Sequence, residues 1–213
     1  MKKVIVLFAA VSLMATSAMA TVVGTAHDLS ATGTGPITSN YSEVCVFCHT
    51  PHAANTAVTN APLWNRATVA GGATGVYAGL DLETPTAAVT TTDIDNTDAL
   101  LCLSCHEGAL ATGNLQNPSN LAGGGQPTFN GNAIGANSNL GTNCDNDHPI
   151  GFNFVDVANL DAEISNTMNG NSLPLFAGDM WCSTCHDVHD DTASPFLQLD
   201  NSGSNLCLAC HNT

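Results

Sequence analysis

Mostly irregular coil with short α-helices and little β-structure is the fold class that this 213-residue sequence predicts. Stretches such as 71–75 and 121–139 carry no sustained helical or strand period. Gly, Asn, Thr, Ser and Ala dominate between the motifs, so few large apolar side chains remain to build a core. Four short cysteine motifs recur along the chain, and we expect the short helices at these motifs.

Residues 1–20 have the layout of a secretory signal peptide. Two lysines precede an apolar run over 4–15, and an A-x-A sequence ends at Ala20. We expect cleavage after Ala20 and export of the remaining chain. The apolar run is too short to span a bilayer and no second such run follows it, so we expect no membrane span.

Eight of the nine cysteines form four identical C-x-x-C-H frames. Two cysteines three residues apart lie on one helical turn and can form thioethers with both vinyl groups of a haem, while the histidine that follows faces the iron. This spacing predicts c-type haem attachment. The predicted attachment residues are Cys45, Cys48, Cys102, Cys105, Cys182, Cys185, Cys207 and Cys210, and the predicted proximal iron ligands are His49, His106, His186 and His211.

A single C-x-x-C could equally be half of a zinc site, a disulfide or a redox dithiol. Zinc does not require a histidine after every cysteine pair, and a disulfide scaffold gives no reason for one. Four copies that all end in histidine therefore favour four covalently attached haem c groups as the cofactors.

Four histidines lie outside the frames: His27, His52, His148 and His189. Four six-coordinate haems need one distal ligand each, so the number matches and all four are predicted metal ligands. A pair of histidine ligands gives a lower potential than histidine with methionine. We therefore interpret Met168 and Met180 as packing residues.

The segment CVFCHTPH, residues 45–52, places His52 one turn beyond His49. His52 cannot reach the opposite face of the same haem, so we expect it to ligate another one; His189 repeats this arrangement. On this argument His52 serves the haem at Cys102/Cys105, and His189 the haem at Cys207/Cys210. His27 and His148 would then serve the haems at Cys45/Cys48 and Cys182/Cys185.

The order of motifs is the same in the two halves of the chain: a lone histidine, a C-x-x-C-H-x-x-H segment and an L-C-L-x-C-H segment. We infer an internal duplication, with one haem pair in residues 21–125 and another in 126–213. The ninth cysteine, Cys144, is interpreted as a buried unreactive thiol, with an intermolecular disulfide or a modification site as alternatives.

Removal of the predicted signal peptide leaves Arg66 as the only strongly basic residue against 18 acidic ones. Such a surface should repel nucleic acid and anionic lipid. The acidic side chains should also favour oxidised iron and lower the haem potentials.

Four segments carry a family likeness: HDLS at 27–30, CVFCHTPH at 45–52, APLWNR at 61–66 and LLCLSCHEG at 100–108. With them the chain resembles the doubled-C-x-x-C-H multihaem cytochromes, and more narrowly the extracellular tetrahaem cytochromes of the OmcE type, which polymerise into filaments on metal-respiring microbes. The resemblance implies a coil fold wrapped round a stacked haem chain, bis-histidine irons and a head-to-tail homopolymer. It also implies an N-terminal histidine that can ligate a haem of the adjacent subunit, and His27 matches that position.

The expected function is therefore that of an extracellular or cell-surface electron-conducting filament subunit, which exchanges electrons with partner cytochromes and with external acceptors such as metal oxides. A monomeric periplasmic tetrahaem electron shuttle is the alternative. A multihaem redox enzyme is the third possibility. Because no frame departs from C-x-x-C-H to mark an open haem, we expect an electron-transfer protein and not an enzyme.

Overall fold

The computed structural model describes residues 22–56, 61, 63–67, 98–107, 115–119, 123–131, 134–141, 144 and 146–212. The predicted signal peptide, residues 1–20, lies outside these ranges, as does the stretch 71–75. Among the described residues, no helix is both long and apolar enough to cross a membrane.

Short elements joined by long irregular segments make up the described chain, which confirms the predicted coil-rich fold with little β-structure. The longest of these helices has eight residues, and the strands have two residues each. In chain order the elements are η1 (Cys45–Phe47), α2 (Ala99–His106), β1 (Phe152–Asn153), α3 (Phe154–Leu160), η3 (Met168–Gly170), β2 (Asp179–Met180), α4 (Cys182–Cys185), η4 (Ser202–Ser204) and α5 (Asn205–Cys210).

The two strands form an antiparallel pair that leads directly into α3. Phe152 pairs with Met180, and Asn153 with Asp179. The Asn153 side chain ends the strand and begins the helix, because its Oδ1 accepts from the Asp156 N–H while its Nδ2 donates to Asp179. Gly178 has φ +92°, and a Cβ there would lie 2.9 Å from Asn153 Nδ2, so this turn requires glycine.

Three small clusters of buried side chains replace a single large core. One joins Tyr41, Phe47 and Leu115 near the first motif, and a second joins Ala99 and Leu103 of α2 to Cys144. The third is the largest and surrounds α5, with the members Phe154, Met168, Leu173, Met180, Ala209 and Cys210. The predicted packing roles of Met168 and Met180 are thereby confirmed.

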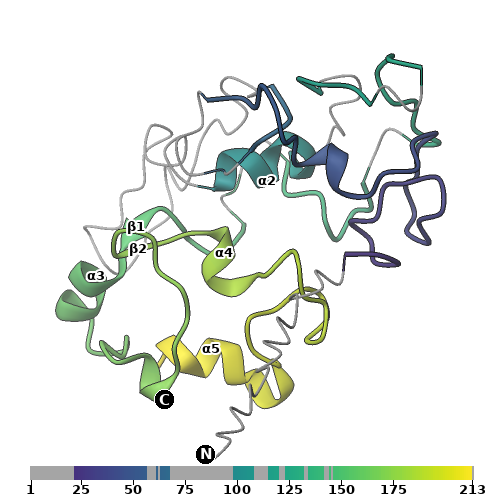
Figure 1. The fold of residues 1–213 in the computed structure, drawn as a ribbon. Coiled ribbons are helices and arrows are strands. Elements are labelled where there is room, and N and C mark those ends of the chain that lie inside the picture. Colours follow the sequence, from purple (N-terminus) through teal and green to yellow (C-terminus); the bar gives the residue numbers. More distant parts are fainter. Residues whose placement is uncertain are drawn as a thin grey trace, which may run out of the picture.

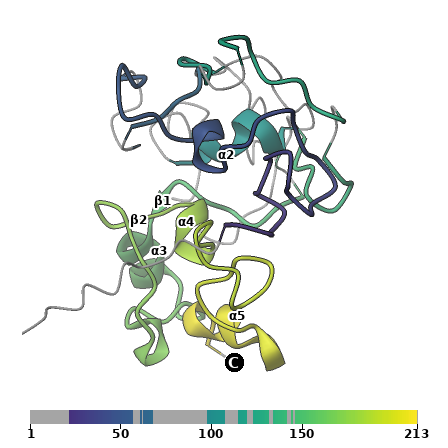
Figure 2. The same ribbon diagram turned by 45° about the vertical axis from the view of Figure 1, so that its right-hand side comes forward.

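The four motif helices follow one another through the molecule. In both views η1 lies beside α2, α4 lies below α2, and α5 lies below α4 (Figures 1 and 2). The first-half segments also pair with residues after 125, since Asn40 N–H donates to the Thr128 carbonyl and Asn130 N–H donates to the Thr38 carbonyl. The division into halves at residue 125 stays a prediction.

Candidate haem-binding motifs

Each C-x-x-C-H frame lies on a short helical turn. The N–H groups of His49, His186 and His211 donate to the carbonyl of the first cysteine of their own motif, at 2.8, 3.0 and 2.9 Å. His106 is the last residue of α2, which also carries Cys102 and Cys105. Both cysteines and the histidine of a motif are therefore brought together by one turn of backbone, as the spacing predicts.

The segment 63–67 forms an irregular partner strand for the first motif. Asn65 N–H donates to the Cys48 carbonyl at 2.8 Å, and its buried side chain donates to the Val46 carbonyl at 2.7 Å. The rings of Trp64 and His49 lie edge to face, with centroids 6.5 Å apart. Sequence reasoning assigned no role to Asn65, because a lone polar residue in a loop gives no periodic signal.

A second device fixes the orientation of several imidazoles. Nδ1 of His106, His148 and His186 lies 2.7, 2.8 and 3.2 Å from the backbone carbonyls of Ser138, Pro149 and Pro195. A carbonyl can only accept, so each Nδ1 carries the proton and Nε2 keeps its lone pair for a metal.

The loop before the first motif places His27 in a similar way. Asp28 is 1 % exposed, and its carboxylate accepts from the N–H groups of Gly24 and Ser30 and from the Ser30 hydroxyl. The His27 ring stacks on Phe196, with centroids 4.5 Å apart. Burial and the neighbouring His106 lower the pKa of His27, which favours the neutral form that binds metal.

Three motif histidines each have one of the other four histidines beside them. The ring centroids of His27 and His106 are 6.1 Å apart, those of His189 and His49 are 6.0 Å apart, and those of His148 and His211 are 6.3 Å apart. Each pair thus joins a motif histidine to one from a distant part of the chain.

These neighbours differ from the predicted pairs. We expected His27 to meet the first motif, His148 the third and His189 the fourth, and the structure instead places them beside the second, fourth and first. The predicted pairs assumed that each half closes on itself, whereas the segment after α4 packs against the first half. The ligand assignments themselves stay predictions. His52 was predicted to meet the second motif, and the structure gives it no ring contact with a described histidine.

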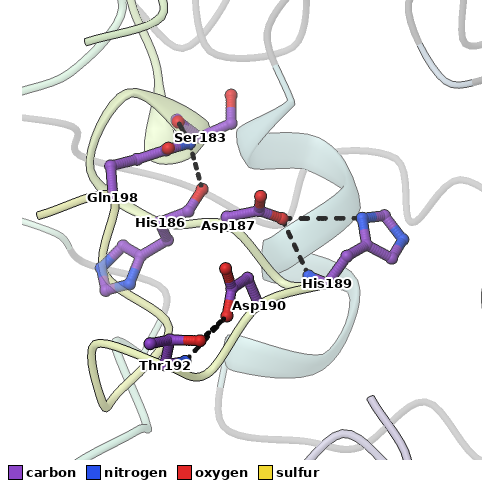
Figure 3. Close-up of polar contacts among 7 residues, drawn as sticks. All are labelled: Ser183, His186, Asp187, His189, Asp190, Thr192 and Gln198. Carbon is purple, nitrogen blue, oxygen red and sulfur yellow. Dashed lines mark hydrogen bonds and ion pairs between the residues drawn. The ribbon is translucent and has the colours of Figure 1, made fainter. Parts of the chain in front are cut away.

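The local steric argument agrees with the side-chain directions. Figure 3 shows His186 and His189 on opposite sides of Asp187, with their rings pointing away from each other. Asp187 accepts from the His189 N–H at 2.9 Å and lies 3.7 Å from its Nδ1. Two histidines three residues apart therefore face different neighbours.

The ring spacings fit one iron between each pair of imidazoles. A metal–nitrogen bond of about 2.0 Å and a nitrogen-to-centroid distance of roughly 1.1 Å put two ligating rings roughly 6.2 Å apart. Within the described ranges no three His, Cys, Asp or Glu side chains converge on a common metal position. Haem iron needs only two protein ligands, because the porphyrin supplies the other four.

Neighbouring thiols link the motifs in the order of the sequence. Burial and the nearby Cys105 thiol raise the pKa of Cys48 to about 12, although part of the Cys48 surface is accessible to water. The neighbouring Cys102 thiol, together with burial, raises the pKa of Cys182. Burial and the Cys210 thiol raise the pKa of Cys185 to about 11. The spatial order is therefore first, second, third, fourth motif.

Two buried polar atoms beside the third motif lack a hydrogen-bond partner among the described residues. Trp181 Nε1 and Ser183 Oγ, on either side of Cys182, are buried and have no hydrogen-bond partner. Such atoms are costly unless a bound group satisfies them. Cys144 packs nearby and is 5 % exposed, so the expected burial of this thiol is confirmed.

Residues 174–213 match a protein family described as the doubled CXXCH motif. No curated protein matches the chain. The matched motif indicates a multihaem cytochrome c. Covalently bound haem c and electron transfer follow from it, and the matched residues contain the third and fourth motifs described above.

Proposed function

We propose that the chain is an exported tetrahaem cytochrome that polymerises head to tail into an extracellular electron-conducting filament. All four motifs would attach haem through the eight predicted cysteines, with His49, His106, His186 and His211 as proximal ligands. The distal ligands within one chain would be His189 for the first haem, His27 for the second and His148 for the fourth. Haem iron supplies the one-electron redox chemistry, and the chain supplies its position and ligands.

One observation supports assembly into a polymer. Each of three motif histidines has a second imidazole 6.0 to 6.3 Å away, and no described histidine stands in that relation to His186 or to His52. A chain with one incomplete iron site and one spare ligand is completed by a second copy. His52 of one subunit would therefore ligate the third haem of the next.

Donor and acceptor are different segments of the chain, so the proposed contact is heterologous and can repeat from subunit to subunit. His52 lies on an exposed turn that Asn117 holds through the carbonyls of His52 and Ala53, each at 2.9 Å. His186 lies after α4, and its imidazole is oriented by the Pro195 carbonyl. A repeating contact that does not close into a ring gives a helical filament.

This assignment changes which histidine acts between subunits. The family resemblance implied His27, but His27 has His106 as its neighbour within the chain. His186 is also close enough to His27 to contribute to lowering its pKa. A comparison of His27 and His52 variants therefore decides which of these two histidines is the ligand between subunits.

The test is electron microscopy of haem-stained material sheared from cells that express the wild type, His52→Ala or His27→Ala. We expect filaments from the wild type, and monomers with four attached haems and one site open to carbon monoxide from His52→Ala. His27→Ala should open a site and still polymerise. Monodisperse wild type with four low-spin haems would instead favour the periplasmic shuttle, and normal filaments from His52→Ala would refute the proposed ligand.

A further inference from the structure

Asp98 bonds to two motif helices at once. Its backbone carbonyl accepts from Cys102 N–H, at 3.2 Å, within α2. Its side chain reaches across to α4, where Oδ1 accepts from Cys182 N–H at 3.1 Å and Oδ2 accepts from Ser183 N–H at 2.9 Å. One residue thus holds the backbone of the first cysteine in both the second and the third motif.

This use of a helix-capping residue is unusual. Asp98 occupies the N-cap position of α2, where an aspartate side chain ordinarily bonds to N–H groups of its own helix. Its side chain makes no such bond there. It caps α4 instead, 84 residues later, and hydrogen bonds to an ionised carboxylate are among the stronger ones in proteins.

Apolar side chains pack closely where α2 meets α4, and we call this contact the junction. Ala99 and Leu103 of α2 are buried with Cys144, and Cys182 of α4 packs against them together with Ile150. The Cys102 thiol lies beside that of Cys182. Any haems attached at these cysteines therefore meet here, at the junction between the first two and last two motifs.

We propose that Asp98 is a positioning residue that fixes the separation of the second and third haems. Its hydrogen bonds to α4 go to the backbone N–H groups of Cys182 and Ser183, so it acts through the backbone of the two helices. Electron transfer between haems falls steeply with distance, so a loosened junction would make this step the slowest in the chain. The inference rests on haem at both motifs and holds whether or not the subunits polymerise.

The test uses the full-length holoprotein with Asp98→Ala, which removes both bonds to α4, and Asp98→Asn, which keeps one acceptor. Asp156→Asn is the control, because it makes the same charge change on an exposed residue of α3. Intact mass gives the number of attached haems. Electron paramagnetic resonance of the oxidised protein reports the magnetic coupling between neighbouring haems, and photoreduction gives the internal transfer rate.

We expect Asp98→Ala to keep its four haems, to lose the coupling of one haem pair and to transfer electrons roughly tenfold more slowly or worse. Asp98→Asn should be intermediate, and Asp156→Asn unchanged. If Asp98→Ala does not fold, the Asp98→Asn coupling decides the matter. The proposal would be overturned if Asp98→Asn and Asp98→Ala both kept the wild-type magnetic coupling between haems. Haem potentials that shift while this coupling stays unchanged would also overturn it. A wild type that lacks haem at either motif would instead refute the proposed function.

Discussion

Glu43, just before the first motif, ties the N-terminal part of the chain to a loop 76 residues later. One carboxylate oxygen accepts from the Ser119 hydroxyl, and the other accepts from the Ser42 N–H and hydroxyl. The Ser119 bond, which outweighs the opposing effect of desolvation, lowers the pKa of Glu43 from its ordinary 4.5. Ser119 N–H also donates to the buried Tyr41 hydroxyl, so this contact supports the packing beneath the first motif.

Because the folded-state pKa of Glu43 lies below its unfolded value, its stabilisation is present above pH 4.5 and is lost as pH falls through the folded value. We expect Glu43→Gln to reduce the free energy of unfolding near neutral pH by less than about 1 kcal/mol, since solvent screens the site. Urea unfolding across the acid range would show the difference from wild type shrinking in acid. Glu163→Gln, on an exposed residue, is the control, and a pH-independent difference would contradict the prediction.

At the scale of elements, the segment 63–67 holds a buried cation against the first motif. Arg66 is 2 % exposed, and its backbone carbonyl accepts from the Asn55 side chain at 2.9 Å. Its guanidinium acts to lower the pKa of the Cys48 thiol, whereas burial and the Cys105 thiol raise that pKa by more. A buried positive charge so placed should disfavour oxidised iron at the first haem.

We expect Arg66→Gln to lower the potential of the first haem, on the order of tens of millivolts, and Arg66→Lys to retain most of the wild-type value. Spectroelectrochemical titration of the haem-loaded protein would resolve the change. Equal shifts at all four haems, or none, would show that Arg66 acts only on the net charge of the chain.

The short elements were the predictable part of this fold. A C-x-x-C-H frame requires one helical turn, and η1, α2, α4 and α5 each supply it at the predicted place. The pairing of 63–67 with the first motif was not predictable, because a single-residue bridge such as that between His49 and Trp64 leaves no alternating pattern. The role of Asp98 was hidden for a similar reason, since its partners lie 84 and 85 residues away.

For the whole molecule, the arrangement of histidines shows the limit of sequence reasoning. Spacing along the chain correctly indicates that His186 and His189 face different neighbours. It carries no information on which distant segment packs against which, and the neighbours of His27, His148 and His189 depend on that packing. The predicted pairs assumed two self-contained halves, whereas His189 of the second half lies beside His49 of the first.

The pair of His189 and His49 joins the two halves of the chain. It predicts that a substitution at His189 opens an iron coordination position at the first motif. We expect His189→Ala to create one haem that binds carbon monoxide, and that haem to be the one at Cys45/Cys48. In a background where both of these cysteines are alanine, the same substitution should add no carbon monoxide binding. New binding in that background would assign His189 to another haem, such as the one at Cys207/Cys210 favoured by spacing.

The contact between His189 and His49 also has a consequence for biogenesis. Export delivers His49 long before His189, so a haem attached at the first motif during export would have one coordination position open until nearly nine tenths of the chain has crossed the membrane. A truncated product would remain in that state and stay reactive toward small ligands such as oxygen. Completion of the first site can therefore serve as a signal that the chain is whole.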